Sequence, residues 1–487
     1  MGILSAILWI PLIGALAILF VPKQAVAVIR GIAVLCASAS FLLAWNLFRS
    51  FDTTVSALQF VERLQWVPEM GMTYTLGVDG LALPMLMLTT LLSLVAIVAS
   101  YSIQERIKGY FGWFLLMEFA ILGVFMAQDW FLFYMFYEIT LIPMFFLIGI
   151  WGGKERGPAS MSFFLYTLAG SVFMLLGIIA AYLATPTHTF DMLEMMKANV
   201  AWDADFQKTV FLAFFIGVAV KVPVFPLHGW LPLAHVEAPV PVSMMLSGIL
   251  LKMGGYGLMR ISGLFPQGIE WFAPVLLALG LINIVYGALM AWKQTDLKSM
   301  VAFSSVSHMG FVLLGIAGLS VTGFVGATMQ MFTHGFTTAA LFFMVGAIYE
   351  RTHTREVTEF GGLGRRMPVY AALMSLSLLA SMGLPGLAGF ISEFHALVGA
   401  FDRWKFWVIL ALVGVLITAA YSLRTIGKMF MGSFNPKWED LKDLSVREIF
   451  VMTPLVVLMV GLGLFPSTAL NMMSATLTHM VAIIGVK

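Results

Sequence analysis

Several acidic, basic and imidazole side chains lie inside stretches of the sequence that are otherwise apolar. They are Glu138, Lys221, Lys252, His308, His334 and Glu393, with Glu118, His228 and His395 as further candidates. A charge at the centre of a bilayer costs at least about 2.5–3.5 kcal/mol on insertion scales, so such a residue needs a partner, a hydrated interior or a function. Chains of Glu, Lys and His at this depth are the usual components of a proton relay. The pattern predicts a protein that moves protons across a membrane.

Glu138 and Lys221 are the strongest candidate pair. Burial weakens proton binding by a lysine and strengthens it by a carboxyl group, and a nearby opposite charge counteracts both effects. If the two side chains meet, a change in the partner of the carboxylate changes the proton affinity of the lysine. Lys221 also lies two residues before Pro223, where the helix is weakest.

Four further residues continue the path in this hypothesis. Lys252 and the imidazoles of His308 and His334 would carry protons onward, because histidine titrates near neutrality. Glu393 follows a second predicted helix break and would be the terminal exchange site.

A structural role is the alternative for each of these side chains. Glu118 would then hydrogen-bond a neighbouring Ser, Thr or Trp. His228 and His395 would cap helix ends or bind water at the helix breaks. For Glu138 with Lys221 this alternative is weaker, because two opposite buried charges are costly to keep.

The composition indicates a membrane protein and excludes several other classes. Of 487 residues 60% are hydrophobic and 11% charged, and the mean hydropathy is +0.95. Soluble domains carry about 25% charged residues, so a soluble globular enzyme is excluded. With 27 basic and 25 acidic residues there is no basic surface for nucleic acid. The single cysteine, Cys36, rules out a disulfide framework, a thiolate zinc site and an iron–sulfur cluster held by this chain alone. We expect no cofactor and no metal to be bound by the chain itself.

The apolar segments predict about fourteen membrane crossings. A transmembrane helix needs about 20 mostly apolar residues. The expected spans are 3–21, 26–48, 80–101, 110–127, 129–151, 160–184, 209–232, 240–261, 272–292, 300–317, 321–348, 369–398, 403–430 and 447–466. We expect the first span to be retained, because it lacks the basic segment and cleavage site of a signal peptide. The predicted class is an all-α polytopic membrane protein.

The distribution of lysine and arginine predicts the orientation. With an even number of spans, both ends of the chain lie on one side and alternate loops can be compared. One set of loops carries 17 of the 27 basic residues and the other carries 8, while Lys221 and Lys252 lie inside spans. Because basic loops remain in the cytoplasm, both termini are predicted on the periplasmic side.

Two of the predicted spans are interrupted. The seventh contains residues 220–226 (VKVPVFP) and the twelfth contains residues 383–389 (GLPGLAG). Proline removes a helix hydrogen bond, and carbonyls freed at this depth need protein or water around them. Corresponding breaks in two halves indicate an internal repeat, although the residues align poorly. The expected units are residues 1–109 (three helices), 110–261 and 272–430 (five helices each), and 431–487 (a loop and the last helix).

The sequence resembles a known family at these positions. The motifs are 78–81 (VDGL), 137–144 (YEITLIPM), 221–232 (KVPVFPLHGWLP), 304–310 (SSVSHMG) and 383–386 (GLPG). Over nearly its whole length the chain is similar to the antiporter-like subunits of NADH–quinone oxidoreductase (respiratory complex I). Within them it is most similar to the chain M branch, the counterpart of mitochondrial subunit 4. Individual motifs are shared with the sister chains L and N and with Mrp-type antiporters. Glu393 favours the chain M branch, because chains L and N usually carry lysine there.

The resemblance implies fourteen helices that include two inverted five-helix repeats, with breaks in the seventh and twelfth helices. It implies coupling of NADH:quinone electron transfer to proton pumping. In the family a glutamate of the fifth helix and a lysine of the seventh form a coupling pair, which Glu138 and Lys221 match. The family's relay residues on helices eight, ten, eleven and twelve are matched by Lys252, His308, His334 and Glu393.

The resemblance also implies that other subunits hold NADH, FMN, the iron–sulfur clusters and quinone. The expected partners are the sister chains L and N on either side, lipids and protons, and the expected location is the bacterial inner membrane. The leading alternative is a subunit of an Mrp-type Na⁺/H⁺ antiporter. Two further hypotheses are a structural spacer with inert ionisable groups and a transporter of organic solutes. A solute transporter is the weaker of these two, because the spans carry single protonatable residues rather than a solute-selective lining.

Overall fold

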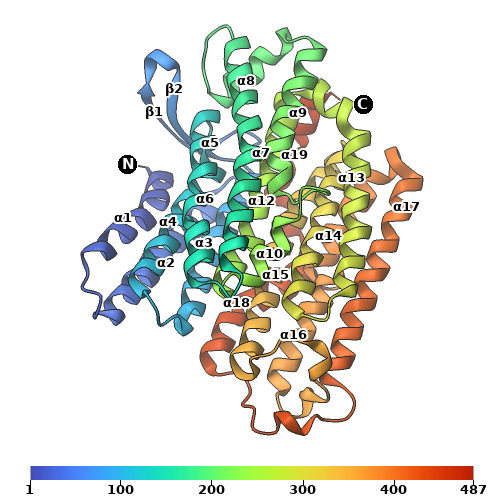
Figure 1. Cartoon of the computed structure of the whole chain (residues 1–487). Helices are drawn as coiled ribbons and strands as arrows, with labels where there is room; N and C mark the ends of the chain where they lie inside the picture. The colour runs from blue at the N-terminus through green and yellow to red at the C-terminus, as the bar shows by residue number, and fades with distance from the viewer. Residues whose placement is uncertain (1, 486–487) are drawn as a thin grey trace.

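Long helices packed side by side form most of the molecule, and a two-stranded hairpin lies at one end (Figure 1). The structure is a computed structural model that describes residues 2–485. The elements of the first half are α1 (Ile3–Phe20), α2 (Val26–Ser50), β1 (Gln59–Val67), β2 (Met72–Val78), α3 (Ala82–Ala99), α4 (Ile107–Met126), α5 (Trp130–Ile139), α6 (Leu141–Trp151), α7 (Arg156–Ala184), α8 (Met192–Ala198), α9 (Ala204–Lys221) and α10 (Trp230–Glu237). The second half contains α11 (Val240–Met245), α12 (Leu251–Leu264), α13 (Pro266–Lys293), α14 (Leu297–Ala317), α15 (Val321–Thr352), α16 (Pro368–Ser381), α17 (Ala388–Phe430), α18 (Val446–Leu464) and α19 (Ser467–Ile484).

Twelve helical stretches of the described residues are long and apolar enough to cross a membrane. An all-α polytopic membrane fold is therefore confirmed. The number of fourteen spans, the inverted repeat and the division into four units stay predictions.

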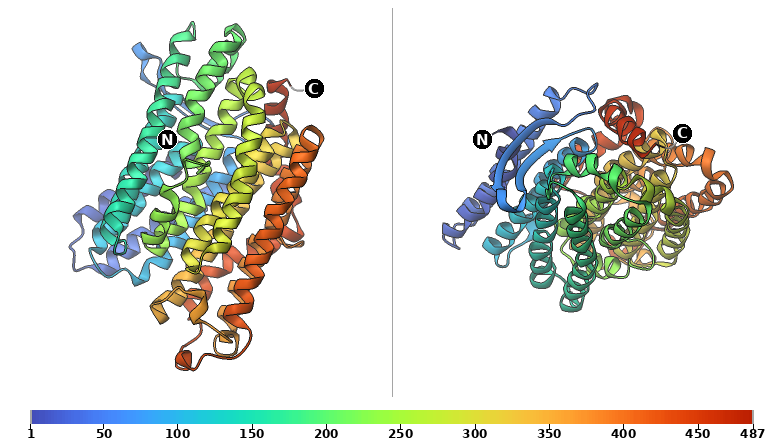
Figure 2. Two further views of the ribbon diagram at one scale, coloured as in Figure 1. Left: turned by 45° about the vertical axis from the view of Figure 1, so that its right-hand side comes forward. Right: turned by 90° about the horizontal axis from the view of Figure 1, so that it is seen from above.

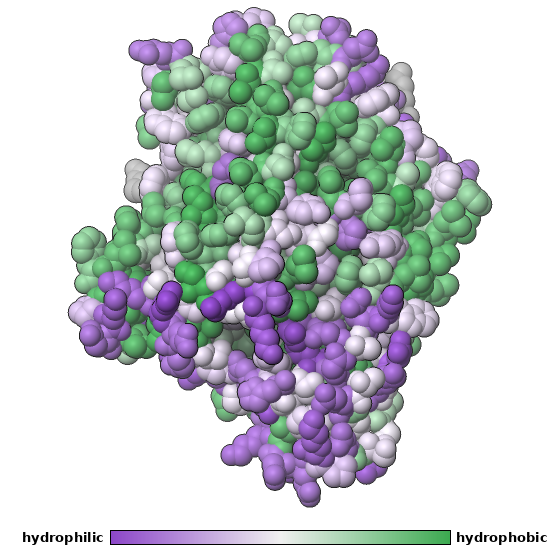
Figure 3. Space-filling model, viewed as in Figure 1, coloured by the Kyte–Doolittle hydropathy of each residue, from purple (hydrophilic) through white to green (hydrophobic). Residues whose placement is uncertain are grey.

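The loops lie at two opposite ends of the bundle. One end, which we call the hairpin face, holds β1, β2, α8 and the described ends of the chain (Figure 1). The other end, the basic face, holds the loops that follow α1, α3, α6, α10, α13, α15 and α17. Hydrophilic residues gather toward the basic face, and a mostly apolar surface lies above them (Figure 3). Met1, which precedes the first predicted span, and Lys487, one of the eight basic residues of the less basic set of loops, lie outside the described residues.

Three spans form the interior of the bundle. An 18-residue stretch of each of the spans Val240–Leu264 and Val321–Thr352 is entirely buried, and the corresponding stretch of Leu297–Ala317 is almost so. They run roughly parallel to the outer helices (Figure 2). The outer helices α1, α2, α7 and α17 expose large apolar side chains, as a surface facing lipid or another membrane protein does. Lys252, His308 and His334, which are buried in these spans, are therefore remote from the outer surface of the bundle.

The seventh predicted span is broken where the prolines indicated. α9 ends at Lys221, a turn follows, and the chain resumes as α10 at Trp230. Pro223 and Pro226 cannot donate backbone hydrogen bonds within this turn. The indole Nε1 of Trp230 reaches back and donates to the carbonyl of Val220 at 2.9 Å. This hydrogen bond ties the first residue of α10 to the last turn of α9 across the break.

The twelfth predicted span is also broken. α16 ends at Ser381 and α17 begins at Ala388. Gly383 and Gly386 adopt φ values of +76° and +92°, which side chains disfavour, so glycine is required here. α17 is one assigned helix of 43 residues, but Trp404 within it has φ −129° and ψ 35°, which separates two helical segments. That kink lies next to the predicted boundary between residues 398 and 403.

Four features were not predicted. β1 and β2 form an antiparallel hairpin in what was expected to be a loop. The fifth span divides into α5 and α6 at Thr140. A π-helical turn, Leu246–Leu250, precedes α12. α19 follows α18 directly and packs against α15, where no further helix was expected.

Candidate relay site

The Lys221 ammonium group points back to the junction of α5 and α6. Its Nζ donates to Thr140 Oγ1 at 2.9 Å and to the carbonyl of Tyr137 at 3.2 Å, and lies 3.6 Å from the centre of the Tyr137 ring. The helix is interrupted here because Pro143 cannot donate to the carbonyl of Ile139. The Lys221 residue is only 1% exposed. Neutral oxygens and an aromatic face therefore surround this ammonium group.

Glu138 lies between the two residues that bind Lys221, but it does not pair with it. No ion pair of 4.0 Å or less joins these two side chains within the described part of the chain. Glu138 is partly buried, and its Oε1 atom is buried with no hydrogen-bond partner. The structure thus brings the two predicted partners into one neighbourhood without contact, and their coupling stays a prediction.

Lys252 and His334 are in direct contact. Lys252 Nζ lies 2.6 Å from His334 Nδ1, and it also donates to the carbonyl of Ser247. Ser247 belongs to the π-helical turn, whose wider winding turns a carbonyl toward the lysine. Both partners are almost completely buried, with exposed fractions of 0% and 4%. This contact joins the eighth and eleventh predicted spans.

His308 binds the predicted terminal acid. Its Nδ1 lies 3.0 Å from Glu393 Oε1, and its Nε2 lies 3.0 Å from Ser381 Oγ, at the end of α16. The rings of His308 and His334 have centroids 5.4 Å apart. A small cavity of about 10 Å³ lies between these histidines and Glu393, close to the minimum that one water molecule needs. Lys252, His334, His308 and Glu393 therefore form one cluster.

A second set of polar side chains braces this cluster between α15 and α17. Thr333 Oγ1 lies 2.9 Å from Ser392 Oγ, and Ser392 donates to Gln330 Oε1. Gln330 Nε2 reaches the carbonyl of His308 at 3.5 Å. These contacts lie beside His334 and Glu393 in sequence and hold the two helices in register.

No hydrogen bond among the described residues links Lys221 to Lys252, but their helices touch beside both lysines. A Cβ at Gly254 would lie 2.7 Å from the Val218 carbonyl and 2.8 Å from the Val222 nitrogen. Only glycine allows this approach of α12 to α9. The two lysines thus sit on adjoining helices.

His235 on α10 is a buried histidine that was not among the predicted site residues. It is fully buried, and neither ring nitrogen has a hydrogen-bond partner. Its ring stacks on Phe342 of α15 at 4.6 Å and 6°. Phe342 lies two turns from His334 along α15, roughly 12 Å. The sequence offered one signal for His235, namely an ionisable residue among apolar residues just beyond the break in the seventh span.

Lys298 was assigned to a loop but is buried beside His235. Its Nζ donates to the carbonyls of Val236 and Ala238 at 3.2 and 2.5 Å. Lys298 and Glu237 both line a cavity of about 610 Å³. This cavity lies at the basic face, so polar side chains extend from that face to the residues flanking His235.

The three remaining candidates lie apart from the cluster. Glu118 on α4 is fully buried, and neither carboxylate oxygen has a partner. His228 Nε2 lies 3.2 Å from Tyr286 Oη in the turn of the seventh span. His395 Nδ1 lies 2.7 Å from the carbonyl of Ile391, on its own helix. Their predicted roles stay predictions.

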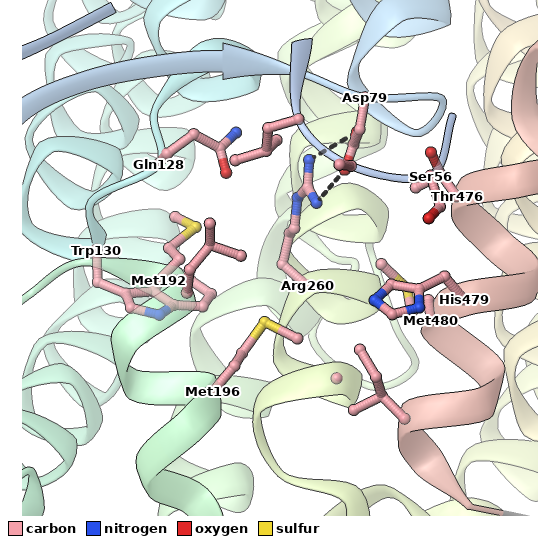
Figure 4. Close-up of a pocket in the computed structure, with 15 residues that line it drawn as sticks. Ser56, Asp79, Gln128, Trp130, Met192, Met196, Arg260, Thr476, His479 and Met480 are labelled. Atoms are coloured by element: carbon pink, nitrogen blue, oxygen red, sulfur yellow. Dashed lines mark hydrogen bonds and ion pairs between the residues drawn. The ribbon is translucent and has the colours of Figure 1, made fainter. Parts of the chain in front are cut away.

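The VDGL motif lies at the hairpin face, in a different site. Arg260 donates to both oxygens of Asp79 at 2.6 and 2.9 Å, beside a cavity of about 210 Å³ with mostly apolar walls (Figure 4). Asp79 also accepts the backbone N–H groups of Leu81 and Ala82 at the start of α3. A Cβ at Gly80 would collide with α19. The motif therefore anchors α3 against α12 and α19.

The chemistry available in the cluster is proton transfer. Among residues 2–485, no group of three or more His, Cys, Asp or Glu side chains is placed to hold a metal ion. The cluster consists of a lysine, two imidazoles and a carboxyl group, each of which can bind and release a proton.

Sequence comparison gives the family. The profile of the family described as NADH:quinone oxidoreductase/Mrp antiporter, transmembrane, matches residues 127–418. NADH-quinone oxidoreductase subunit M of Rhodobacter capsulatus is 40% identical over 495 residues, covering 99% of this chain and 96% of that one. The chain belongs to this family. The antiporter-family segment contains the whole cluster with Glu138 and Lys221, and excludes Glu118.

Two further relatives extend over the same length. NAD(P)H-quinone oxidoreductase chain 4 of Gloeobacter violaceus is 40% identical over 484 residues, covering 97% of this chain and 91% of that one. A chain of respiratory complex I from Thermus thermophilus has a TM-score of 0.89 and 31% identity, covering 98% of this chain and 99% of that one. The antiporter-family fold therefore extends beyond the segment that the family profile matches.

Proposed function

We propose that this chain is a proton-translocating subunit of the membrane arm of NADH:quinone oxidoreductase, respiratory complex I. The observation that carries the proposal is the buried cluster of Lys252, His334, His308 and Glu393. Four ionisable groups in one membrane interior are costly to keep, so a function in moving protons is the default hypothesis for them. The reaction is inferred from two relatives that are 40% identical to this chain and are named NAD(P)H-quinone oxidoreductase chain 4 and NADH-quinone oxidoreductase subunit M.

The proposed relay has two parts. Glu138 and Lys221 form the first, in which a change in the surroundings of Glu138 alters proton binding at Lys221. The buried cluster forms the second, and Glu393 is its terminal exchange site. In this scheme the first part lies in the five-helix unit 110–261, which also supplies Lys252 to the cluster, and the rest of the cluster lies in the inverted unit 272–430.

We propose that protons are taken up from the basic face. The excess of lysine and arginine there supports a cytoplasmic position for that face and a periplasmic position for both termini in a bacterial inner membrane. The 610 Å³ cavity opens a polar route to Lys298. His235 then bridges the residues that bind Lys298 and the cluster at Lys252, because it is a buried imidazole with both nitrogens free.

The proposed setting is a row of membrane-arm subunits. The sister antiporter-like chains L and N would contact the exposed apolar faces, with lipid filling the remainder. Glu138 is only partly buried, so a neighbouring chain would complete its surroundings. NADH, FMN, the iron–sulfur clusters and quinone would be held by other subunits, and this chain supplies no redox chemistry.

The second candidate is a subunit of an Mrp-type Na⁺/H⁺ antiporter. It is favoured only by the shared family description, which includes both protein types. It would use the same cluster with a sodium gradient in place of electron transfer.

The deciding experiment measures proton pumping in sealed membranes that carry Lys221→Ala. Pumping is normalised to assembled complex and compared with NADH-driven electron transfer. We expect both pumping and turnover to fall at least about tenfold with assembly retained, since proton transfer by a positioned group contributes 10²–10⁴-fold. Normal pumping would overturn the relay. Sodium-dependent proton movement without NADH would favour the second candidate.

Lys208→Ala is the matched control. Lys208 lies on the same helix, α9, and pairs with Asp205 at the surface. Its loss removes the same side chain and charge without touching the relay, so pumping should be unchanged.

A further inference from the structure

Asn283 on α13 bridges the break of the seventh span. Its Oδ1 accepts the backbone N–H of Phe225 at 2.8 Å, and its Nδ2 donates to the carbonyl of Pro223 at 3.1 Å. Both backbone groups lie in the turn between α9 and α10, two and four residues after Lys221. Asn283 is fully buried, so no solvent competes for these bonds. One amide side chain thus binds the freed backbone groups on both sides of Val224.

The same stretch of α13 is fixed against the helix that carries His308. Ser307 Oγ donates to the carbonyl of Ile284, the residue after Asn283, at 2.8 Å. A Cβ at Gly287 would lie 2.5 Å from the Ser307 nitrogen, so the two backbones are in contact there. Because close-packed backbones move together, α13 is a rigid link between the broken span and α14.

We propose that Asn283 is a positioning residue for proton transfer. It fixes the turn that sets where Lys221 lies, and through Ile284 and Ser307 it ties that turn to His308. A change at Lys221 therefore reaches the second part of the relay through α13. This inference rests on the proposed function, since it assigns a mechanical link between two residues of that relay.

The chemistry of the asparagine is specific to this task. The turn needs one acceptor for the Phe225 amide and one donor for the Pro223 carbonyl, a fixed distance apart. A side-chain amide supplies both on one rigid plane. A protonated aspartic acid supplies the same pair, whereas an ionised aspartate supplies only acceptors.

The test compares Asn283→Ala and Asn283→Asp in the assembled complex. We expect Asn283→Ala to lower NADH-driven pumping about tenfold, because a buried hydrogen-bonding group loses its partner next to the relay. Hydrogen–deuterium exchange of the peptide containing Phe225 should become faster. Asn283→Asp should pump nearly normally at low pH and lose pumping as the pH rises, because only the protonated form donates to Pro223.

The pH profile must be separated from other titrating groups nearby. Near Asn283, titratable residues are carried by the broken span (Lys221 and His228), by α13 (Tyr286), by α14 (His308) and by α17, which packs against α13 (Tyr421). They are common to all variants, so the wild type and Asn283→Ala record their contribution. The added pH dependence of Asn283→Asp belongs to the new carboxyl group.

Asn199→Ala is the matched control. Asn199 is another buried asparagine, which donates to the carbonyl of Leu264 near the hairpin face. Its loss should leave exchange at Phe225 and the pH profile unchanged. Unaltered pumping by Asn283→Ala with faster exchange at Phe225 would overturn the positioning role. If Asn283→Ala does not assemble, a flat pH profile for Asn283→Asp overturns it. Failure of the proposed function itself would appear separately, as normal pumping by Lys221→Ala.

Discussion

Lys252 Nζ and His334 Nδ1 lie 2.6 Å apart in the interior of the bundle. An imidazole nitrogen accepts a hydrogen bond only when it carries no proton, and an ammonium group can only donate. The contact therefore fits one proton held between two bases. Two protons there would place like charges in contact. In the proposed relay, a proton that arrives at either residue would therefore displace the other toward His308.

The first prediction concerns His334. His334→Gln keeps a side-chain oxygen that can accept from Lys252, but it cannot carry a proton. We expect assembly to be retained and pumping to fall at least about tenfold, in line with the loss of a proton-transfer group. The measurement is NADH-driven proton uptake or release in sealed vesicles, normalised to assembled complex.

His479→Gln is the control for His334→Gln. His479 lies on α19 beside the cavity at the hairpin face, away from the cluster. The same substitution there should leave pumping intact. Equal losses in the two variants would mean that the effect is general and not due to the relay.

The second prediction tests uptake through His235. His235→Phe preserves the stacking on Phe342 at 4.6 Å but removes both ring nitrogens. Because aromatic packing is kept, we expect a stable protein whose pumping is slowed about tenfold or more. The pumping rate at several external pH values is the measurement. Pumping that matches the wild type at every pH would remove His235 from the path.

The third prediction concerns packing within α17. A Cβ at Gly399 would overlap the backbone of Gly323, whereas one at Gly427 would meet open space. Gly399→Ala should destabilise the chain by about 1–3 kcal/mol through overpacking. Gly427→Ala on the same helix should be neutral or slightly stabilising. Thermal unfolding in detergent compares them, and equal midpoints would contradict this packing.

The fourth prediction is a pH effect outside the membrane. Lys437 donates to Glu359 at 2.8 Å and lowers the pKa of that carboxyl below its ordinary value of 4.5, with a smaller contribution from Thr354. The stabilisation is therefore present above pH 4.5 and is lost as the pH falls through the lowered pKa. Hydrogen exchange at the turn Pro436–Trp438 should quicken, after correction for intrinsic rates, as the pH drops from 6 toward 3. Glu359→Gln should abolish this change.

Much of the fold follows from simple patterns. Apolar segments of about 20 residues predict spans because the bilayer sets helix length. Pro223 and Gly383 predict the two breaks because each residue disturbs regular helical geometry. The hairpin was not predicted, because the polar segment that forms it offers a weaker structural signal than a long apolar segment does. α19 was missed because Asn471 and His479 make it too polar for a membrane span.

The site was only partly predictable. The types of its residues stand out, since each is ionisable within an apolar stretch. The contact of Lys252 with His334 joins residues 82 positions apart, so it depends on how the helices pack. His235 was missed because the predicted seventh span ends at residue 232, whereas the helix α10 continues to Glu237. The roles of Asn283 in the turn and of Lys298 at the cavity follow from backbone contacts that no spacing reveals.

The π-helical turn Leu246–Leu250 sets the direction in which the side chains of α12 face. A π turn uses about one residue more than an α turn for the same rotation, so it absorbs that residue without turning the helix that follows. If the same residues wound as a regular α-helix, every later residue of α12 would be rotated by roughly 100° about the helix axis. Lys252 would then face away from His334, and Arg260 away from Asp79, without any change of residue type. The winding of one turn therefore orients two basic side chains at opposite ends of α12.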